Sequence, residues 1–247
     1  MKDDAGYNFL NVTKYPTDQQ PDAALGIAAP EFVSSPKEGA EIVSLPDPAE
    51  ISVPPLDLRD AVASRRSIRA FSREPISLSA LSYLLWASAG VTGEDIMYRA
   101  VPSAGALHPV DTYLAVQQVE GLSVGIWRYH PELHALERII EGPAPVAALG
   151  RACMMQPAVL RAPVVFFWAA TPYRTVWKYG LRGYRDIFLD AGHICQNCYL
   201  AAEQCGLGLC AVGAFYDDDA AAALTLTEDQ ILLYAAACGV PREDPRA

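Results

Sequence analysis

Two short apolar runs, at residues 163–170 and 231–238, constrain the fold of this chain more than any other feature of its sequence. Each run is far too short to cross a bilayer, because a membrane-spanning helix needs about 20 apolar residues. An unbroken apolar run of this length is typical of a buried strand. We therefore expect a central sheet with other elements packed against its faces.

From residue 56 onward, helical and strand patterns interleave without a strict β-α-β order. Asp57 and Ser77 are suitable N-cap residues, and leucines at helical spacing follow Ser77. Gly206 is suited to end a long helix over residues 184–205. This order favours an α+β fold with a mixed central sheet flanked by helices. The other expected elements are a first helix from Asp57 to residue 63, strands at 111–119 and 209–215, a hairpin of 124–129 and 135–140, a short helix at 217–224, and a Thr227–Gln230 capping box before the last apolar run.

Residues 1–55 differ from the rest of the chain, because they are rich in proline and have little hydrophobic periodicity. We interpret them as an irregular arm rather than a domain. Scattered aromatic side chains, including Tyr7, Tyr15 and Phe32, indicate that the arm lies along the body or along a partner subunit. No further boundary is visible, so residues 56–247 are expected to form one domain.

The overall charge limits the partners, since the chain has a formal net charge of −10 and a pI of about 4.8. Such a surface repels nucleic acid and anionic membranes, and neither is expected as a partner. The N-terminus is polar and no apolar segment follows it, which predicts a cytoplasmic location. The Cys195–Cys198 pair lies within a helical pattern and has no matching second pair, so core thiols are expected. The four histidines have no metal-ligand spacing, and no metal is expected.

The densest basic cluster in this acidic chain places three guanidinium groups and a hydroxyl within five residues, just after a short helix. Arginine binds phosphate through a bidentate fork, and the hydroxyl adds a donor. The sequence therefore offers a phosphate site, with a solvated charged face as the alternative. The cluster reads Arg65-Arg66-Ser67-Ile68-Arg69.

Two other segments are candidates for chemistry. Small residues between Pro102 and Pro109 predict a rigid loop whose backbone can approach a flat ligand, or else a simple connection into a strand. Lys178 and Tyr179 lie just before the long helix in a polar segment, where they are candidates for proton transfer or for ordinary surface positions. A nominal G-x-G-x-x-A at residues 206–211 follows a helix and opens a strand, the reverse of a dinucleotide-binding motif.

Three motifs together resemble the nitroreductase-like flavoprotein superfamily, and most closely its SagB-type, or thiazole/oxazole oxidase-like, branch. The resemblance covers residues 56–241. Arg65-Arg66-Ser67-Ile68-Arg69-Ala70-Phe71 is similar to the family motif R-R-S-x-R-x-F. The segment from Pro102-Ser103-Ala104-Gly105 up to Pro109 is similar to P-S-A-G-x-x-x-P. Arg182-Gly183-Tyr184-Arg185, Asp190-Ala191-Gly192-His193 and Gln196-Asn197 are similar to R-x-Y-R…D-A-G-H…Q-N.

The resemblance implies an α+β fold, an intertwined homodimer and one FMN in each interface site. In this arrangement Arg65 and Ser67 hold the FMN phosphate, Arg66 lies near the ribityl chain, and Arg69 lies at the pyrimidine edge. A loop of the other subunit, formed by Pro102, Ser103, Ala104 and Gly105, covers the ring. Gln156 faces the cofactor, Gly213 and Ala214 approach the ring through backbone, and Arg242 completes the phosphate site.

The same resemblance gives Lys178 and Tyr179 the catalytic position, as the pair that removes a proton while FMN takes the hydride. The expected function is oxidation of a C–N or C–C bond in an azoline-type peptide or a small molecule. One alternative is an NAD(P)H-dependent reductase of nitroaromatics or quinones, in which NAD(P)H reduces the flavin. A second alternative is a flavin-binding protein without catalysis.

Overall fold

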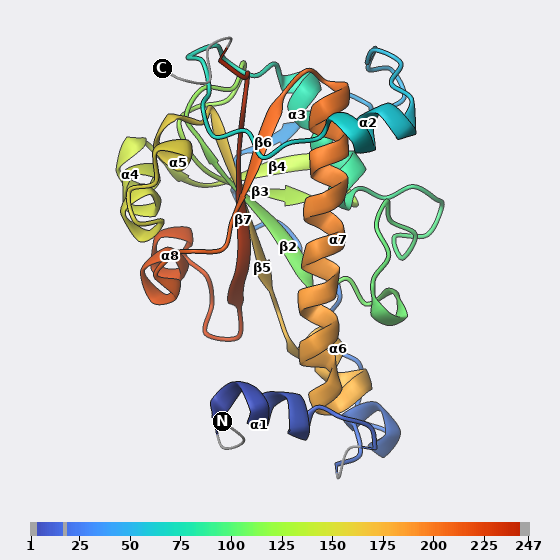
Figure 1. Cartoon of the computed structure of the whole chain (residues 1–247). Coiled ribbons are helices and arrows are strands. Elements are labelled where there is room, and N and C mark those ends of the chain that lie inside the picture. Colours follow the sequence, from blue (N-terminus) through green and yellow to red (C-terminus); the bar gives the residue numbers. More distant parts are fainter. Residues whose placement is uncertain (1–3, 17–18, 243–247) are drawn as a thin grey trace.

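The structure is a computed structural model, and it describes residues 4–16 and 19–242. A seven-stranded sheet in the order β1-β4-β3-β2-β5-β7-β6 lies at its centre (Figure 1). Both apolar runs form central strands of this sheet, β5 and β7, as predicted. The strands are β1 Ile42–Ser44, β2 Val110–Val116, β3 Gly125–His130, β4 Ala135–Glu141, β5 Val164–Ala170, β6 Gly208–Val212 and β7 Ile231–Gly239.

Strand β5 is apolar along its whole length because both of its faces are buried. Phe166 and Trp168 point to one face of the sheet, Val165 and Phe167 to the other, and all four are at most 1% exposed. The first face is covered by α3 and α7, and the second by α4, α5 and α8 (Figure 1). Because helices cover both faces, neither face of β5 tolerates the polar residues of a half-exposed strand.

Helices of the described residues are α1 Ala5–Val12, α2 Leu58–Ser64, α3 Leu78–Ala89, α4 Pro143–Ala152, α5 Pro157–Arg161, α6 Tyr173–Tyr179, α7 Gly183–Gln204 and α8 Asp217–Leu224. Both expected N-caps are present: Asp57 accepts from the Arg59 amide at 2.8 Å, and Ser77 from the Ala80 amide at 3.2 Å. Gly206 has φ +68° after the end of α7, the left-handed conformation that glycine favours there. None of these helices is long and apolar enough to cross a membrane.

The α+β prediction is confirmed, but the expectation of a mixed sheet is wrong. Every strand ladder among the described residues is antiparallel. Strand direction depends on which end of the sheet each connection returns to, and residue patterns do not carry that information. The predicted strands at 111–119 and 209–215 also end earlier, at Val116 and Val212.

The arm and two short helices differ from what the sequence predicts. The arm is less irregular than predicted, because it contains α1 and contributes β1, which pairs with β4. Helices α4 and α5 were missed, although each has proline at its first position, a recognised start signal. The predicted contact between Thr227 and Gln230 is present, because the Gln230 side chain accepts from the Thr227 amide at 3.2 Å just before β7. Lys178 and Tyr179 precede α7, as predicted, and lie at the end of the short helix α6.

Candidate functional site

The segment that carries the basic cluster lies directly along β6. The Ile68 amide donates to the Leu209 carbonyl at 3.0 Å, and Ser67 pairs with Leu209 in an isolated parallel bridge. A Cβ at Gly208 would lie 2.7 Å from the Ile68 Cβ, so only glycine allows this close approach. Glycine and strand together fix the side chains of the cluster relative to the sheet.

Tyr199 of α7 joins this segment to β6, and sequence reasoning did not assign it a role. Its hydroxyl lies 3.0 Å from Ser67 Oγ and accepts from the Ala211 amide at 2.8 Å. The Arg65 guanidinium lies 5.3 Å from the centre of its ring, within range of a cation–π contact. A mostly buried tyrosine needs a partner for its hydroxyl, and this requirement was the one available signal.

The remaining arginines of the cluster do not all point the same way. Arg66 folds back on α2, where its Nη1 donates to the carbonyls of Ala63 and Arg65 at 3.0 and 2.8 Å. Arg69 lies near Cys210 of β6; burial raises the pKa of that thiol, and the Arg69 charge opposes the rise. The structure therefore groups Arg65, Ser67 and Arg69 along β6 and leaves Arg66 outside the group.

A second set of predicted residues meets just beyond the end of β6. Gln156 Nε2 donates to the Ala214 carbonyl at 2.8 Å and to the Cys153 carbonyl at 3.0 Å, which ties the start of α5 to the Gly213–Ala214 turn. The two residues before Gln156, Met154 and Met155, have φ of +56° and +54°. Left-handed backbone costs a residue with a side chain roughly 1–2 kcal/mol, so the local fold holds this turn against strain.

Arg242 lies beside the basic segment through its backbone, since its amide donates to the Ala70 carbonyl at 3.1 Å. Its side chain lines a cavity on the face of the sheet covered by α4 and α5. Tyr199 belongs to the core on the opposite face. The backbone of Arg242 is thus next to the basic segment, while its side chain lines the cavity on the α4–α5 face.

The predicted loop at Pro102 is fixed by Asp190 of α7. Asp190 Oδ2 accepts from Ser103 Oγ at 2.5 Å, and Asp190 Oδ1 accepts from the Ala104 amide at 3.3 Å. Burial raises the pKa of Asp190, and these two hydrogen bonds oppose that rise. Gly105 has φ +63°, a conformation that favours glycine. The D-A-G-H motif thus supplies the anchor of the loop.

Lys178 and Tyr179 converge on this loop within one chain. A Cβ at Gly105 would lie 2.4 Å from Tyr179 Oη and 3.0 Å from Lys178 Nζ, so both polar tips lie against the glycine. Lys178 Nζ is 5.6 Å from the centre of the Tyr179 ring. Lys178 is exposed and Tyr179 is half-buried. An amine, a phenol and a small-residue loop therefore share one surface that a ligand can reach.

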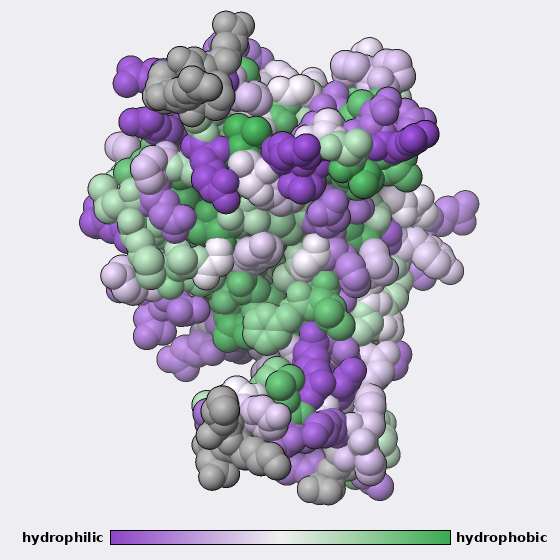
Figure 2. Space-filling model, in the orientation of Figure 1, coloured by the Kyte–Doolittle hydropathy of each residue, from purple (hydrophilic) through white to green (hydrophobic). Residues whose placement is uncertain are grey.

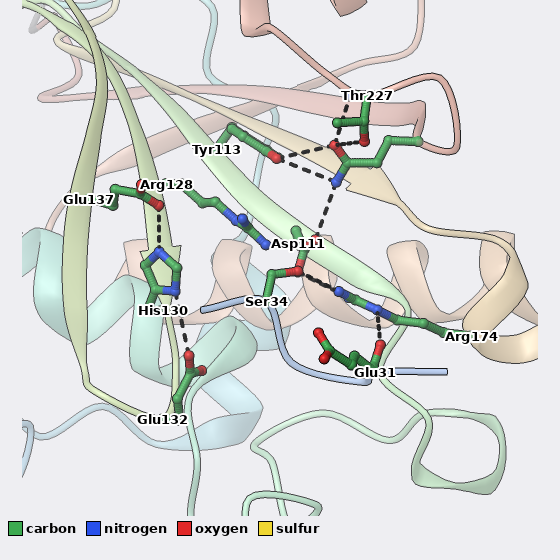
Figure 3. Close-up of polar contacts among 11 residues, drawn as sticks. Glu31, Ser34, Asp111, Tyr113, Arg128, His130, Glu132, Glu137, Arg174 and Thr227 are labelled. Carbon is green, nitrogen blue, oxygen red and sulfur yellow. Dashed lines mark hydrogen bonds and ion pairs between the residues drawn. The ribbon is translucent and has the colours of Figure 1, made fainter. Parts of the chain in front are cut away.

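A buried polar network holds α6 in this position (Figure 3). Arg174, one turn before Lys178, is 4% exposed and pairs with Asp111 of β2 at 3.2 Å. Asp111 also pairs with Arg128 at 3.1 Å. From the arm, the Glu31 carbonyl and Ser34 Oγ accept from Arg174 at 3.1 and 2.6 Å. One guanidinium therefore joins the sheet, the arm and the helix that carries the Lys178–Tyr179 pair.

Loss of this guanidinium is expected to cost stability. Arg174→Leu should lower the free energy of unfolding by roughly 2–4 kcal/mol, because it breaks a buried ion pair and leaves hydrogen-bond acceptors unpaired. The loss of unfolding free energy should be smaller than for a buried carboxylate left without any partner, because Asp111 still pairs with Arg128 in this variant. Urea unfolding measures it. The control is Arg138→Leu, whose ion pair with Glu41 is more exposed and should contribute about 0–1 kcal/mol; equal losses in the two variants would contradict the prediction.

The arginine group and the Lys178–Tyr179 pair lie toward opposite ends of α7. Tyr199 contacts Arg65 and Ser67, whereas the pair precedes the first residue of α7, Gly183. The loop that both side chains touch is anchored at Asp190, and at 1.5 Å per residue Asp190 and Tyr199 are separated by roughly 14 Å along the helix axis. In Figure 1, α2 lies beside the end of α7 and α6 lies at its start.

The cysteines behave as core thiols. Five are buried and Cys205 is half-buried, and burial raises the pKa of Cys195 to about 12 and that of Cys153 to about 11. Within the described part of the chain, no group of His, Cys, Asp and Glu side chains is arranged to hold a metal ion.

Comparison with known proteins gives a consistent family assignment. The sequence model described as the Nitroreductase family matches residues 62–240. A protein of Methanocaldococcus jannaschii that bears the name nitroreductase MJ1384 is 39% identical over 191 residues, which cover 77% of this chain and 93% of that protein. The trifolitoxin-processing protein TfxB of Rhizobium leguminosarum bv. trifolii is 34% identical over 120 residues, which cover 47% of this chain and 32% of TfxB.

Solved structures share the fold. A protein of Anabaena variabilis described as a nitroreductase has a TM-score of 0.69 at 28% identity, over 83% of this chain and 42% of that one. A chain of the Escherichia coli microcin synthetase McbBCD complex with truncated pro-MccB17 bound has a TM-score of 0.64 at 22% identity, over 97% and 93%. The NADPH:FMN oxidoreductase of Vibrio harveyi complexed with NAD+ has a TM-score of 0.56 at 19% identity, over 76% and 70%. The last two similarities establish the fold alone.

Proposed function

The chain belongs to the nitroreductase family, and from this premise we propose that it is an FMN-dependent oxidoreductase whose active site forms between two copies of the chain. Family membership makes it an oxidoreductase of the flavin type. The identity of the flavin, the dimer and the substrate are the proposal. The observation that carries it is the convergence of Lys178 and Tyr179 on Gly105, apart from a separate group of arginines and a serine along β6.

The residues along β6 fit the phosphate of FMN. Arg65 and Arg69 form no ion pair with a carboxylate among the described residues, whereas Arg128, Arg138 and Arg174 do. Two unpaired guanidinium groups next to Ser67, in a chain of net charge −10, favour an anionic ligand. The Tyr199 hydroxyl can donate to Ser67 Oγ, which leaves the serine proton available for a phosphate oxygen.

The flavin ring would meet polar backbone and the Gln156–Ala214 contact beyond β6. FMN, when bound there, supplies the acceptor for a hydride. Arg69 would place positive charge near the reduced ring, where it stabilises developing negative charge. Arg65 and Ser67 bind and orient, and the strained turn at Met154 and Met155 holds Gln156 in place.

The spacing along α7 favours an active site shared between subunits. Arg65 contacts α7 at Tyr199, whereas the loop that carries Gly105 contacts it at Asp190, so we assign the Lys178–Tyr179 pair and the Pro102–Gly105 loop to the flavin of the partner. Apolar surface suited to such a dimer is present: Phe188 and Leu189 of α7 are 53% and 58% exposed. Figure 2 shows apolar surface over this part of α7.

For the reaction, we propose oxidation of a C–N or C–C bond in a SagB-type activity, with an azoline-type peptide or a small molecule as substrate. The pair would remove the proton while the hydride leaves to the flavin. TfxB is named for processing trifolitoxin, and the McbBCD structure contains truncated pro-MccB17, so two relatives by sequence or fold are linked to peptides. These names support a peptide substrate here. Reduction of nitroaromatics or quinones with NAD(P)H is the second candidate, favoured by the Vibrio harveyi neighbour.

Purified protein should be yellow and should release FMN rather than FAD on denaturation. The reason is that the β6 group offers one phosphate site and that residues 206–211 lie in the wrong context for an adenine dinucleotide. An absorbance spectrum followed by the mass of the released cofactor provides the measurement, and light scattering on the same sample should report a dimer. A colourless protein that takes up no FMN, or a monomer that keeps its flavin, would overturn the proposal.

A further inference from the structure

One cavity of the described residues has no part in the proposed reaction. Its volume is about 920 Å³, and it lies between α4, α5 and the end of β2. Ligand pockets typically measure about 300–1,000 Å³ and are mostly apolar with a few polar groups. Its floor is buried and apolar, formed by Leu149, Val159, Val165 and Phe167. Gln117 fixes one wall, because its Nε2 donates to the carbonyls of Val159 and Ala162.

The charge of the lining is opposite to that of the chain. Arg73, Arg161 and Arg242 line the cavity, and no Asp or Glu of the described residues does. The whole chain has 29 acidic and 19 basic residues, so an all-basic lining departs from its general surface. Arg73 and Arg161 are exposed and make no ion pair with a described carboxylate. They form a rim that can meet an anion without first giving up another partner.

We propose that this cavity binds a small amphipathic carboxylate, with the apolar body of the ligand on the buried floor and its carboxylate at the rim formed by Arg73 and Arg161. Aliphatic and aromatic side chains provide the transfer free energy, and the guanidinium groups select for the negative charge. The cavity shares only Arg242 with the residues expected to hold the flavin, because Arg65, Ser67, Arg69, Gln156 and Ala214 are absent from its lining. The inference therefore does not rest on the proposed function.

The test compares two ligands that differ in charge and share an alkyl chain. Purified protein, with whatever flavin it carries, is titrated calorimetrically with sodium octanoate and with octan-1-ol at neutral pH and low salt. Octanoate should bind with one site per chain and roughly tenfold or more tighter than the alcohol, as expected for charge-assisted hydrogen bonds. Its affinity should fall with added salt, because the arginines are exposed.

Variants locate the site. Arg73→Gln combined with Arg161→Gln should bring the octanoate affinity down to that of octan-1-ol, and Arg151→Gln, an exposed arginine of α4 outside the lining, should change neither. Ala147→Trp should block both ligands by filling the cavity, whereas Ala144→Trp on the same helix should not. Circular dichroism checks that each variant folds.

Several outcomes would overturn the inference. They are no octanoate binding at all, equal binding of acid and alcohol, an effect of Ala144→Trp as large as that of Ala147→Trp, or no effect of the double arginine variant. The flavin content of every sample separates this result from the proposed function. If octanoate expels flavin, it binds at the flavin site and the cavity proposal is wrong, while the proposed function stands.

Discussion

Replacing Lys178 and Tyr179 together by alanine is expected to lower turnover of an azoline-type or similar carbon-acid substrate by about 10²–10⁴-fold, the usual contribution of a positioned general base. Flavin retention should not change, because both side chains lie against Gly105 and away from the arginine group along β6. Reduction of a nitroaromatic or quinone should fall little, since such acceptors can draw their proton from water. Steady-state rates with both substrate classes, on samples of equal flavin content, provide the measurement.

The matched control is Trp177→Phe, a change in the same helix. Trp177 donates from Nε1 to the Ile27 carbonyl at 2.9 Å and packs against Phe32, so it serves the contact with the arm. This variant should keep most of its activity with both substrate classes. Equal losses on both classes in the double variant would mean that the pair shapes the pocket without acting as a base. If activity falls with neither substrate class, Lys178 and Tyr179 are ordinary surface residues without a role in the reaction.

Arg65→Ala is expected to weaken FMN binding by roughly 2–4 kcal/mol, the order found when one partner of a desolvated charge pair is removed. The variant loses both the guanidinium and its contact with the Tyr199 ring. Titration of the apoprotein with FMN, followed by flavin fluorescence, measures the change. Arg66→Ala is the control, because Arg66 bonds to the carbonyls at the end of α2 and should change the FMN affinity much less. An Arg65→Ala affinity within twofold of the original would mean that the cluster is only a solvated face.

Combining these two variants tests whether the active site is shared. A chain with Arg65→Ala lacks its flavin anchor, and a chain with Lys178→Ala and Tyr179→Ala lacks its base. If the pair serves the flavin of the partner, mixed dimers contain one site in which the flavin anchor and the base are both intact, and carbon-acid oxidation returns on mixing. If each chain uses its own pair, every site in the mixture lacks one of the two, and activity stays low.

Local sequence signals specified much of the secondary structure. The apolar runs became β5 and β7 because buried strands exclude polar residues from both faces. Asp57, Ser77 and Gly206 marked helix ends because each satisfies backbone groups within one turn of its own position. The basic motif and the small-residue loop were visible for the same reason, since each is contiguous in the chain.

The tertiary structure decided what depends on distant segments meeting. The sequence by itself determined an α+β chain with a local basic cluster and a Lys178–Tyr179 pair. Only the fold determined that the sheet is antiparallel, that Tyr199 joins Arg65 to β6, and that Arg174 ties the arm to the helix carrying the pair. Strand direction and such contacts arise from chain connections and packing across many residues, and no residue spacing along the sequence encodes them.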